Sequence, residues 1–387
     1  MIRSHRVSGS EMKSFDIVVV GAGIVGCAVA RELSRAGMRV GIVEGGAHRG
    51  ATAAGMGHVV VMDDSPAQLV LTQYSCSLWR KEADHLPVAV EYEGFGTIWI
   101  AANDEEMEEV HAKHAIYAQT GVVSAVLNAA ELVMAEPNLR KDLAGGLLVP
   151  HDAVIYPPAA AEFFLSEAQR LGAALFRSRA VQASHGEVSL EDGTLLQAER
   201  IVLATGTECD LLSALPLQKR KGHLAITDRY PGFLCHQLVE LGYLKSAHKL
   251  VADSVAFNIQ PRQTGQLLIG SSRQYGDDDP GVDAAILRQM LERAVSYMPA
   301  LAGMSVLRVW TGFRAATLDK LPLIGPAAGL SDDTSLWLAA GFEGLGITNA
   351  LGAARLLLDG LLNRTPEIDA GPYLPARMVN RMEIARA

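Results

Sequence analysis

The chain has 387 residues, of which 49% are apolar and 20% charged, and 37 are glycines. This composition is typical of a globular α/β protein with two or three structural units, and it argues against a disordered or fibrous chain. The formal net charge of −9 leaves no broad basic surface to neutralise phosphates, so nucleic-acid binding is not expected.

Cysteine usage and hydropathy set further limits. The four cysteines are scattered without C-x-x-C spacing, so we predict no metal site held by this chain alone and a reduced, cytoplasmic setting. No apolar run approaches the roughly 20 residues that span a bilayer, which leaves peripheral association with the inner face of the membrane open. Residues 1–14 lack the apolar core of a signal peptide and are predicted to form a flexible extension.

The organised chain begins with a βαβ pattern. The continuous apolar run FDIVVV (15–20) predicts a strand buried on both faces. Residues 21–37 predict a turn and a helix that ends at a glycine, and MRVGIVE (38–44) predicts a second strand. The first half of the chain therefore opens as a doubly wound fold would.

A glycine motif lies between the first strand and the helix. Gly21, Gly23 and Gly26 form G-x-G-x-x-G, with Ile24 and Val25 inside it. The first glycine permits a tight turn, the second lets the backbone approach a pyrophosphate, and the third allows close helix packing. Glu44, at the end of the second strand, can accept hydrogen bonds from a ribose diol. The pattern predicts dinucleotide binding, but it does not separate FAD from NAD because both contain an ADP half.

A second cluster of small residues follows the βαβ pattern. The stretch GGAHRGATAAGMGHVV (45–60) can place main chain against a flat ring system, or it can be a flexible loop. The residues that we expect at a cofactor here are Gly45, Gly50, Ala51, Thr52, Gly55, Met56 and Gly57.

The rest of the chain alternates predicted strands and helices. Helical patterns cover 63–90, 104–121 and 284–298, and residues 152–176 combine a helix led by proline with a following strand. Strand patterns cover 91–103, much of 181–206, 223–228 and 254–274. Residues 336–364 repeat the order of strand, glycine-rich turn and long helix. We find no tandem repeat or low-complexity linker, so the domains are predicted to be interleaved.

Five motifs in this order carry a resemblance to a known family. They are GAGIVG with Glu44, RGATAAGMG, IVLATG (201–206), TGFRAATLDKLPLIGP (311–326) and AAGFEGLGITNALG (339–352). Together they resemble the D-amino-acid oxidase and glycine oxidase superfamily of flavoproteins, from residue 15 to about residue 373. The resemblance implies an FAD-binding Rossmann-like domain interleaved with a mixed β-sheet substrate domain. It implies FAD-binding segments at 15–90, 145–220 and 311–375, substrate-binding segments at 91–144 and 221–310, and a tail at 376–387.

Within the superfamily, residues 219–248 and the form GxEGLGIT look most like catalytic subunits of bacterial multisubunit amine dehydrogenases. These include D-hydroxyproline dehydrogenase, opine oxidase and a hydrogen cyanide synthase subunit. The resemblance implies a hetero-oligomer with a companion subunit that carries an iron–sulfur cluster, and an additional FMN between subunits stays open. Relatives often have histidine where this chain has Phe342, which puts a contact from that side chain in doubt.

The resemblance also assigns roles to particular residues. It implies contacts with the ADP portion of FAD from Val181, Ala204, Thr205 and Gly206. It implies that Arg314, which follows Gly312, binds the substrate carboxylate, as a planar guanidinium does bidentately. The second glycine turn would bring a helix N-terminus to the reactive end of the cofactor and stabilise negative charge on the reduced flavin. Its residues are Gly341, Phe342, Glu343, Gly344, Leu345, Gly346, Ile347 and Thr348.

The candidate catalytic residues are Arg314, His58, His223, Tyr243 and Glu343. The last four are also residue types that often have purely structural roles. No acid–base pair is required, because a neutral amine can deliver hydride directly. We expect an FAD-dependent dehydrogenase that oxidises a C–N bond, with hydroxy-D-proline as the leading substrate. The alternatives are a self-sufficient oxidase that forms hydrogen peroxide, a non-catalytic electron-relay subunit, and an NAD-dependent dehydrogenase.

Overall fold

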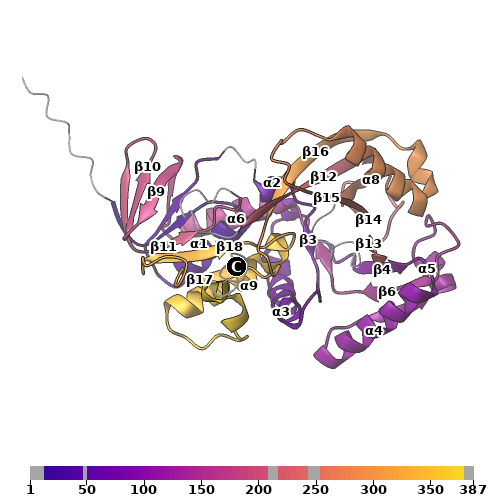
Figure 1. Cartoon of the computed structure of the whole chain (residues 1–387), viewed down its shortest axis with the longest axis horizontal. Coiled ribbons are helices and arrows are strands. Elements are labelled where there is room, and N and C mark those ends of the chain that lie inside the picture. The colour runs from indigo at the N-terminus through magenta and orange to yellow at the C-terminus, as the bar shows by residue number, and fades with distance from the viewer. Residues whose placement is uncertain (1–12, 47–49, 208–216, 243–252, 379–387) are drawn as a thin grey trace, which may run out of the picture.

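The computed structural model describes residues 13–46, 50–207, 217–242 and 253–378. These residues form two eight-stranded sheets and one two-stranded sheet, with the large sheets on opposite sides of Figure 1. The first sheet has the order β17-β18-β11-β1-β2-β8, and β10 and β9 extend it from β11. Its strands are β1 (Lys13–Val20), β2 (Val40–Val43), β8 (Ala174–Phe176), β9 (Ala180–Ser184), β10 (Glu187–Leu190), β11 (Leu195–Leu203), β17 (Leu323–Pro326) and β18 (Leu336–Ala340).

The centre of the first sheet is parallel and buried. β1 pairs in parallel with both β2 and β11, and β11 pairs in parallel with β18. Side chains from both faces of β1 are buried, since Ile17 and Val19 belong to one hydrophobic cluster and Val18 and Val20 to another. This explains why the strand has a continuous apolar run rather than an alternating one.

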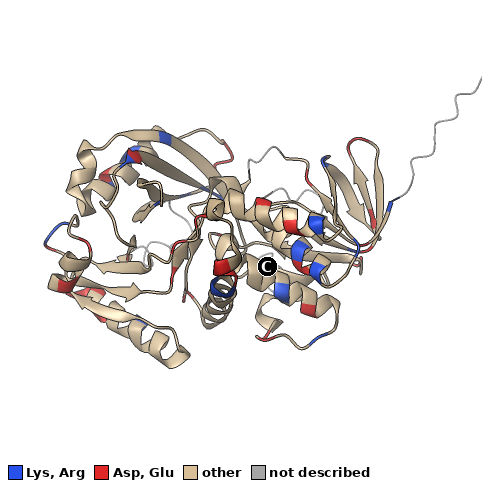
Figure 2. Cartoon of the chain, turned by 180° about the vertical axis from the view of Figure 1, so that it is seen from behind, with Lys and Arg blue, Asp and Glu red and all other residues tan. Residues whose placement is uncertain are grey.

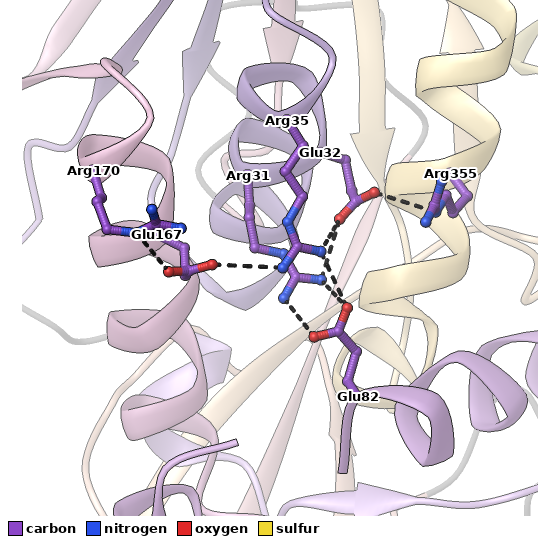
Figure 3. A network of polar contacts seen from close by, with 7 residues as sticks. All are labelled: Arg31, Glu32, Arg35, Glu82, Glu167, Arg170 and Arg355. Carbon is purple, nitrogen blue, oxygen red and sulfur yellow. Dashed lines mark hydrogen bonds and ion pairs between the residues drawn. The ribbon is translucent and has the colours of Figure 1, made fainter. Parts of the chain in front are cut away.

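Helices cover the first sheet and are joined by a network of ion pairs (Figure 3). The helices are α1 (Ile24–Arg35), α2 (Ala51–Ala54), α3 (Pro66–Glu82), α6 (Pro157–Arg170) and α9 (Gly346–Leu361). α1 packs against α6 and α9, and α3 packs against α9. Arg31 has a fully buried side chain, and its guanidinium pairs with Glu82 at 3.1 Å and lies 4.2 Å from the ring centroid of Phe164. The buried charge is thus compensated where the helices meet, which fixes their packing.

The second sheet is mixed and has the order β16-β12-β15-β14-β13-β4-β6-β5. Its strands are β4 (Thr97–Ala101), β5 (Ala125–Asn128), β6 (Gly145–Val149), β12 (Gln218–Arg229), β13 (Gln237–Glu240), β14 (Ser254–Pro261), β15 (Gln266–Tyr275) and β16 (Val306–Ala316). α4 (Asp104–Thr120), α5 (Ala129–Ala135) and α8 (Ala284–Tyr297) accompany it. On one face, Phe257 stacks on Tyr297 of α8 with ring centroids 4.6 Å apart. β3 (His58–Val59) and β7 (Ala153–Val154) form the small third sheet.

The mixed α/β class predicted from the sequence is confirmed. The exact domain boundaries stay a prediction. The strands β6 and β16 hydrogen-bond within the second sheet, although 145–149 and 311–316 were placed with the FAD-binding segments. β16 is followed by β17 of the first sheet, and β6 is followed by β7 of the small third sheet and then by α6.

The charged residues lie mostly at the periphery. In the view of Figure 2, acidic and basic positions are interspersed along the helices that cover the first sheet. None of the helices in the described ranges is both long and apolar enough to cross a membrane. Within the same ranges, no three His, Cys, Asp or Glu side chains are grouped so that they could hold a metal ion.

Candidate active site

The first glycine turn packs so closely against neighbouring backbone that Gly21 and Gly26 have no room for a Cβ. It connects the end of β1 at Val20 to the start of α1 at Ile24. Gly21 has a φ of 106°, a left-handed conformation that favours glycine. A Cβ on Gly26 would lie 1.9 Å from the carbonyl oxygen of Gly21. The first helical hydrogen bond is donated by the amide of Cys27. Of the amides before it, those of Ala22 and Ile24 are bonded to side chains, which leaves those of Gly23, Val25 and Gly26 for an anion.

Glu44 is held against this turn by the backbone. Its Oε2 accepts a hydrogen bond from the amide of Ala22 at 2.7 Å, and its Oε1 accepts one from Gly46 at 2.7 Å. These two bonds orient the carboxylate at the end of β2, where the sequence predicts a ribose contact. Arg177 and Val181 line the cavity in the same region.

The loop after Glu44 forms the short helix α2 and lies between the two large sheets. Thr52 accepts a hydrogen bond from the amide of Ile24 at 3.0 Å. On the other side, Trp310 of β16 donates its indole N–H to the carbonyl of Ala54 at 3.2 Å. A Cβ on Gly312 would lie 2.4 Å from the Cβ of Ala54. The glycine therefore allows the second sheet to approach this loop.

The second glycine turn follows β18 and opens α9. Gly341 has a φ of 75°, and Glu343 has a φ of 52°, which is uncommon for a residue with a side chain. The first backbone bond inside α9 is donated by Asn349 to Leu345, so the amides before Asn349 lie ahead of the helical ladder. The chain thus presents two helix N-termini, and both adjoin the same cavity.

A cavity of about 1090 Å³ connects all of these features. The predicted site residues that line it are Gly21, Gly23, Ile24, Val25, Glu44, Gly45, Gly50, Ala51, Thr52, Gly55, Met56, Gly57, His58, Val181, Ala204, Thr205, Gly206, Gly312, Arg314, Gly341, Phe342, Glu343, Gly344, Leu345, Gly346 and Ile347. Three predicted residues do not line it: Gly26 packs behind the first turn, Thr348 donates its hydroxyl to the carbonyl of His58, and His223 lies behind the wall. Tyr243 lies outside the described residues.

Arg314 and Glu343 belong to a cluster of buried charges at the second sheet. Glu343 Oε1 lies 3.2 Å from a guanidinium nitrogen of Arg220 and 3.6 Å from Nε of Arg273. Burial alone would raise the pKa of Glu343, but the neighbouring arginines outweigh burial and lower it to about 2; they are Arg273, Arg314 and Arg220. Glu343 is therefore ionised at neutral pH, and it is not available as a proton donor.

His58 is fixed by a chain of hydrogen bonds. Gln237 donates its amide to the carbonyl of Ala153, so the Oε1 of Gln237 accepts from His58 Nδ1, 2.6 Å away. His58 Nε2 then accepts from Nδ2 of Asn258 at 3.1 Å. Burial, together with the charge of Arg314, lowers the pKa of His58. Both ring nitrogens of this neutral histidine are engaged, so His58 holds Asn258 at the cavity wall rather than offering a free base.

His223 is also fully engaged. Its Nε2 accepts a hydrogen bond from the amide of Asp283 at 2.9 Å, which leaves Nδ1 to donate to the hydroxyl of Ser272, also at 2.9 Å. Burial, aided by the charge of Lys221, lowers the pKa of His223. The structure therefore brings His58 but not His223 to the cavity.

Sequence reasoning missed several residues of the second sheet that line the cavity. They are Thr97, Trp99, Gly222, Asn258, Ser271 and Arg273. Alternation along the strands at 97–101, 254–261 and 266–275 was the available signal, because residues two apart face the same side of a sheet. Which face meets the cavity is decided by how the sheet packs on the first one, and this is not readable from one strand.

Comparisons with known proteins agree with this geometry. Residues 16–359 match the family model described as FAD dependent oxidoreductase (DAO). The chain is 26% identical to a glycine oxidase of Pseudomonas aeruginosa, over 93% of this chain and 98% of that protein. It is 24% identical to one of the subunits of opine oxidase from Rhizobium meliloti, over 81% and 85% of the two chains. It is also 24% identical to the hydrogen cyanide synthase subunit HcnC of Pseudomonas aeruginosa, over 94% and 96%.

Solved structures have the same fold. The crystal structure of glycine oxidase from Geobacillus kaustophilus matches with a TM-score of 0.83 and 24% identity, over 95% of this chain and 99% of that one. L-proline dehydrogenase from P. horikoshii matches with a TM-score of 0.85 and 22% identity, over 96% and 99%. Because the family model spans most of the chain and the predicted motifs converge on one cavity, the chain belongs to the DAO family of FAD-dependent oxidoreductases, with a glycine oxidase-like fold.

Proposed function

We propose that this protein oxidises the C–N bond of an amino acid and passes the electrons to a partner subunit, with hydroxy-D-proline as the leading substrate. The observation that carries the proposal is the position of Arg314 and Glu343 beside the second glycine turn, in the cavity that also contains the first turn and Glu44. A cation at this wall suits a substrate carboxylate.

The residues present fit FAD. The first turn offers the amides of Gly23, Val25 and Gly26 at a helix N-terminus for a pyrophosphate, and Glu44 can accept hydrogen bonds from a ribose. The second turn would meet the isoalloxazine end, with Gly344 and Gly346 leaving room for a ring. When bound, FAD supplies the two-electron acceptor for the hydride that leaves the substrate carbon.

The chain's own residues would orient the substrate and select its charge. Arg314 would hold the carboxylate through its guanidinium, which fixes the direction of the α-carbon. The ionised Glu343 would favour positive charge on the substrate nitrogen as the amine becomes an imine. No proton acceptor has to be assigned to His58, because the substrate can bind as the neutral amine.

Two further parts of the proposal concern partners. Relatives named as subunits, one of opine oxidase and one of hydrogen cyanide synthase, support a hetero-oligomer. We propose that the companion carries an iron–sulfur cluster and that an FMN can lie between the subunits. Purification together with the products of neighbouring genes, followed by iron, sulfide and flavin analysis, tests both.

The test of the main proposal is anaerobic mixing of the holoenzyme with amino acids. The D and L forms of proline and hydroxyproline, glycine and opines are compared, and the expected result is loss of visible flavin absorbance with the preferred substrate.

Arg314→Ala should lower kcat/KM about 100-fold, since a charged bidentate contact is lost. Arg288→Ala is the matched control, because Arg288 is exposed on α8. Absence of bleaching with every amino acid would overturn the proposal. Unchanged activity of the complex with Arg314→Ala would favour an electron-relay subunit.

A second candidate is a self-sufficient oxidase. The likeness to a glycine oxidase over nearly the whole of both chains favours it. Peroxide formed stoichiometrically by the isolated chain in air would support the oxidase, whereas turnover only with an artificial acceptor would support the dehydrogenase.

A further inference from the structure

Gly222 lies directly beneath the guanidinium of Arg314. It is on β12 and pairs with Gly312 of β16 in the register that places Arg220 opposite Arg314. A Cβ on Gly222 would lie 2.6 Å from Nη1, 2.9 Å from Nη2 and 3.0 Å from Cζ of Arg314. All three distances are shorter than ordinary contacts, so the guanidinium occupies the space that any side chain at position 222 would need.

The guanidinium is also held by a hydrogen bond. Arg314 Nη1 donates to the carbonyl oxygen of Ser272 at 3.1 Å. The Ser272 hydroxyl accepts from the backbone amide of His223 at 2.9 Å, and the His223 ring is anchored in turn by the amide of Asp283. His223 therefore braces the strand segment that supplies the carbonyl.

Gly222 differs from Gly21, Gly26 and Gly57, three other close-packed glycines near the cavity, in what an added Cβ would contact. A Cβ on Gly21, Gly26 or Gly57 would meet backbone atoms within 2.5 Å. A Cβ on Gly222 would meet only the far end of a long side chain, which can move aside. Substitution of Gly222 should therefore leave the fold in place and displace the guanidinium.

We propose that Gly222 is a positioning residue for the substrate carboxylate: its missing side chain lets Arg314 lie against β12, bonded to Ser272 and braced by His223. This inference rests on the proposed function of Arg314. It adds that substrate binding depends on where the guanidinium lies as well as on its charge. The location is set by Gly222, which never touches the substrate.

The test uses ligands that cannot be oxidised at nitrogen. Tetrahydrofuran-2-carboxylate has the shape of proline without the amine, and tetrahydrofuran-2-carboxamide lacks the negative charge. Calorimetric titration of the FAD-loaded wild type, Gly222→Ala, Arg314→Ala and the double variant gives the Kd values. Gly303→Ala is the control, because a Cβ there has no neighbour within 4 Å.

Gly222→Ala should weaken binding of the carboxylate about tenfold and change binding of the carboxamide less than about twofold. In the Arg314→Ala background, adding Gly222→Ala should cause no further loss, because the two residues act through one contact. FAD content and the unfolding temperature should match those of Gly303→Ala.

Several outcomes would overturn the inference. They are an unchanged carboxylate Kd, equal losses for both ligands, a second full loss in the Arg314→Ala background, and failure of Gly222→Ala to fold. A loss of carboxylate binding in Arg314→Ala but not in Gly222→Ala would reject only the role of Gly222. The proposed role of Arg314 itself would be rejected if the wild type bound the carboxylate and the carboxamide equally well and Arg314→Ala left both Kd values unchanged.

Discussion

At one end of the cavity, around Gly21 and Glu44, the wall includes close-packed glycine backbone and a carboxylate that two amides orient, with Arg177 and Val181 beside them. At the other end, around Arg314 and Glu343, the wall includes long charged side chains from β15, β16 and the second glycine turn, and Arg220 of β12 pairs with Glu343 without lining the cavity. The first end requires glycines, because a Cβ at these positions would collide with neighbouring atoms. The second end requires arginine and glutamate charges that compensate one another. The two ends should therefore fail in different ways when they are mutated.

The largest expected effect is at the glycine end. Gly26→Val should reduce FAD retention at least tenfold, because even the Cβ would collide with the carbonyl of Gly21 at 1.9 Å. The measurement is the ratio of flavin to protein after gel filtration, with far-UV circular dichroism as the check on folding. Gly303→Ala serves again as the control. Normal FAD content in Gly26→Val would mean that FAD binding at the glycine end of the cavity does not require the absence of a side chain at position 26.

The next effect is at the charged end and should depend on pH. Glu343→Gln leaves buried arginines without their carboxylate, so unfolding at pH 7 should require about 3 kcal/mol less than in the wild type. The folded-state pKa of Glu343 is lowered to about 2. Its stabilising contribution is therefore complete above the unfolded value near 4.5 and is lost as the pH falls toward 2.

Denaturant titrations at several pH values measure this difference. The wild type should converge with Glu343→Gln as the pH falls below about 4. The matched control is Glu292→Gln, which removes an exposed pair with Arg288 and should change stability by less than about 1 kcal/mol. Equal losses of unfolding free energy in Glu343→Gln and Glu292→Gln would show that the buried ion pairs at the cavity stabilise the fold no more than an exposed pair does.

The smallest effect concerns a second buried carboxyl, behind the cavity wall. Burial raises the pKa of Asp152 to about 7, although Thr97 and the amide of Val61 donate hydrogen bonds to it. The folded state holds this proton more tightly than the unfolded chain. The associated stability is therefore present below pH 4 and is lost as the pH rises through 7.

Asp152→Asn cannot ionise, and its amide can still meet the hydroxyl of Thr97. Relative to the wild type it should gain at least about 1 kcal/mol in unfolding free energy between pH 5 and pH 8. Denaturant unfolding at these two pH values measures the gain. Parallel behaviour of both proteins would mean that Asp152 does not carry this proton. The two carboxyls therefore differ: arginines lower the pKa of the buried Glu343, whereas burial raises the pKa of Asp152.

The glycine end of the cavity could be predicted from the amino-acid sequence. The order of strand, glycine turn, helix and acidic residue is local, since each of these features is fixed by the backbone geometry of neighbouring residues. The same reasoning located the second glycine turn, and the five ordered motifs identified the family that the comparisons support. The choice of hydroxy-D-proline was not determined in this way and stays part of the proposal.

The composition of the charged end could not be predicted in this way, because it depends on how distant strands pack together. Arg220, Arg273 and Arg314 lie on three different strands, and they meet Glu343 because the second sheet packs across the turn before α9. His58 and His223 looked alike in the sequence, yet the packing brings one to the cavity and places the other behind it. Local pattern determines the conformation of a turn, whereas long side chains from distant strands are brought together by sheet pairing and layer packing, which depend on the whole chain.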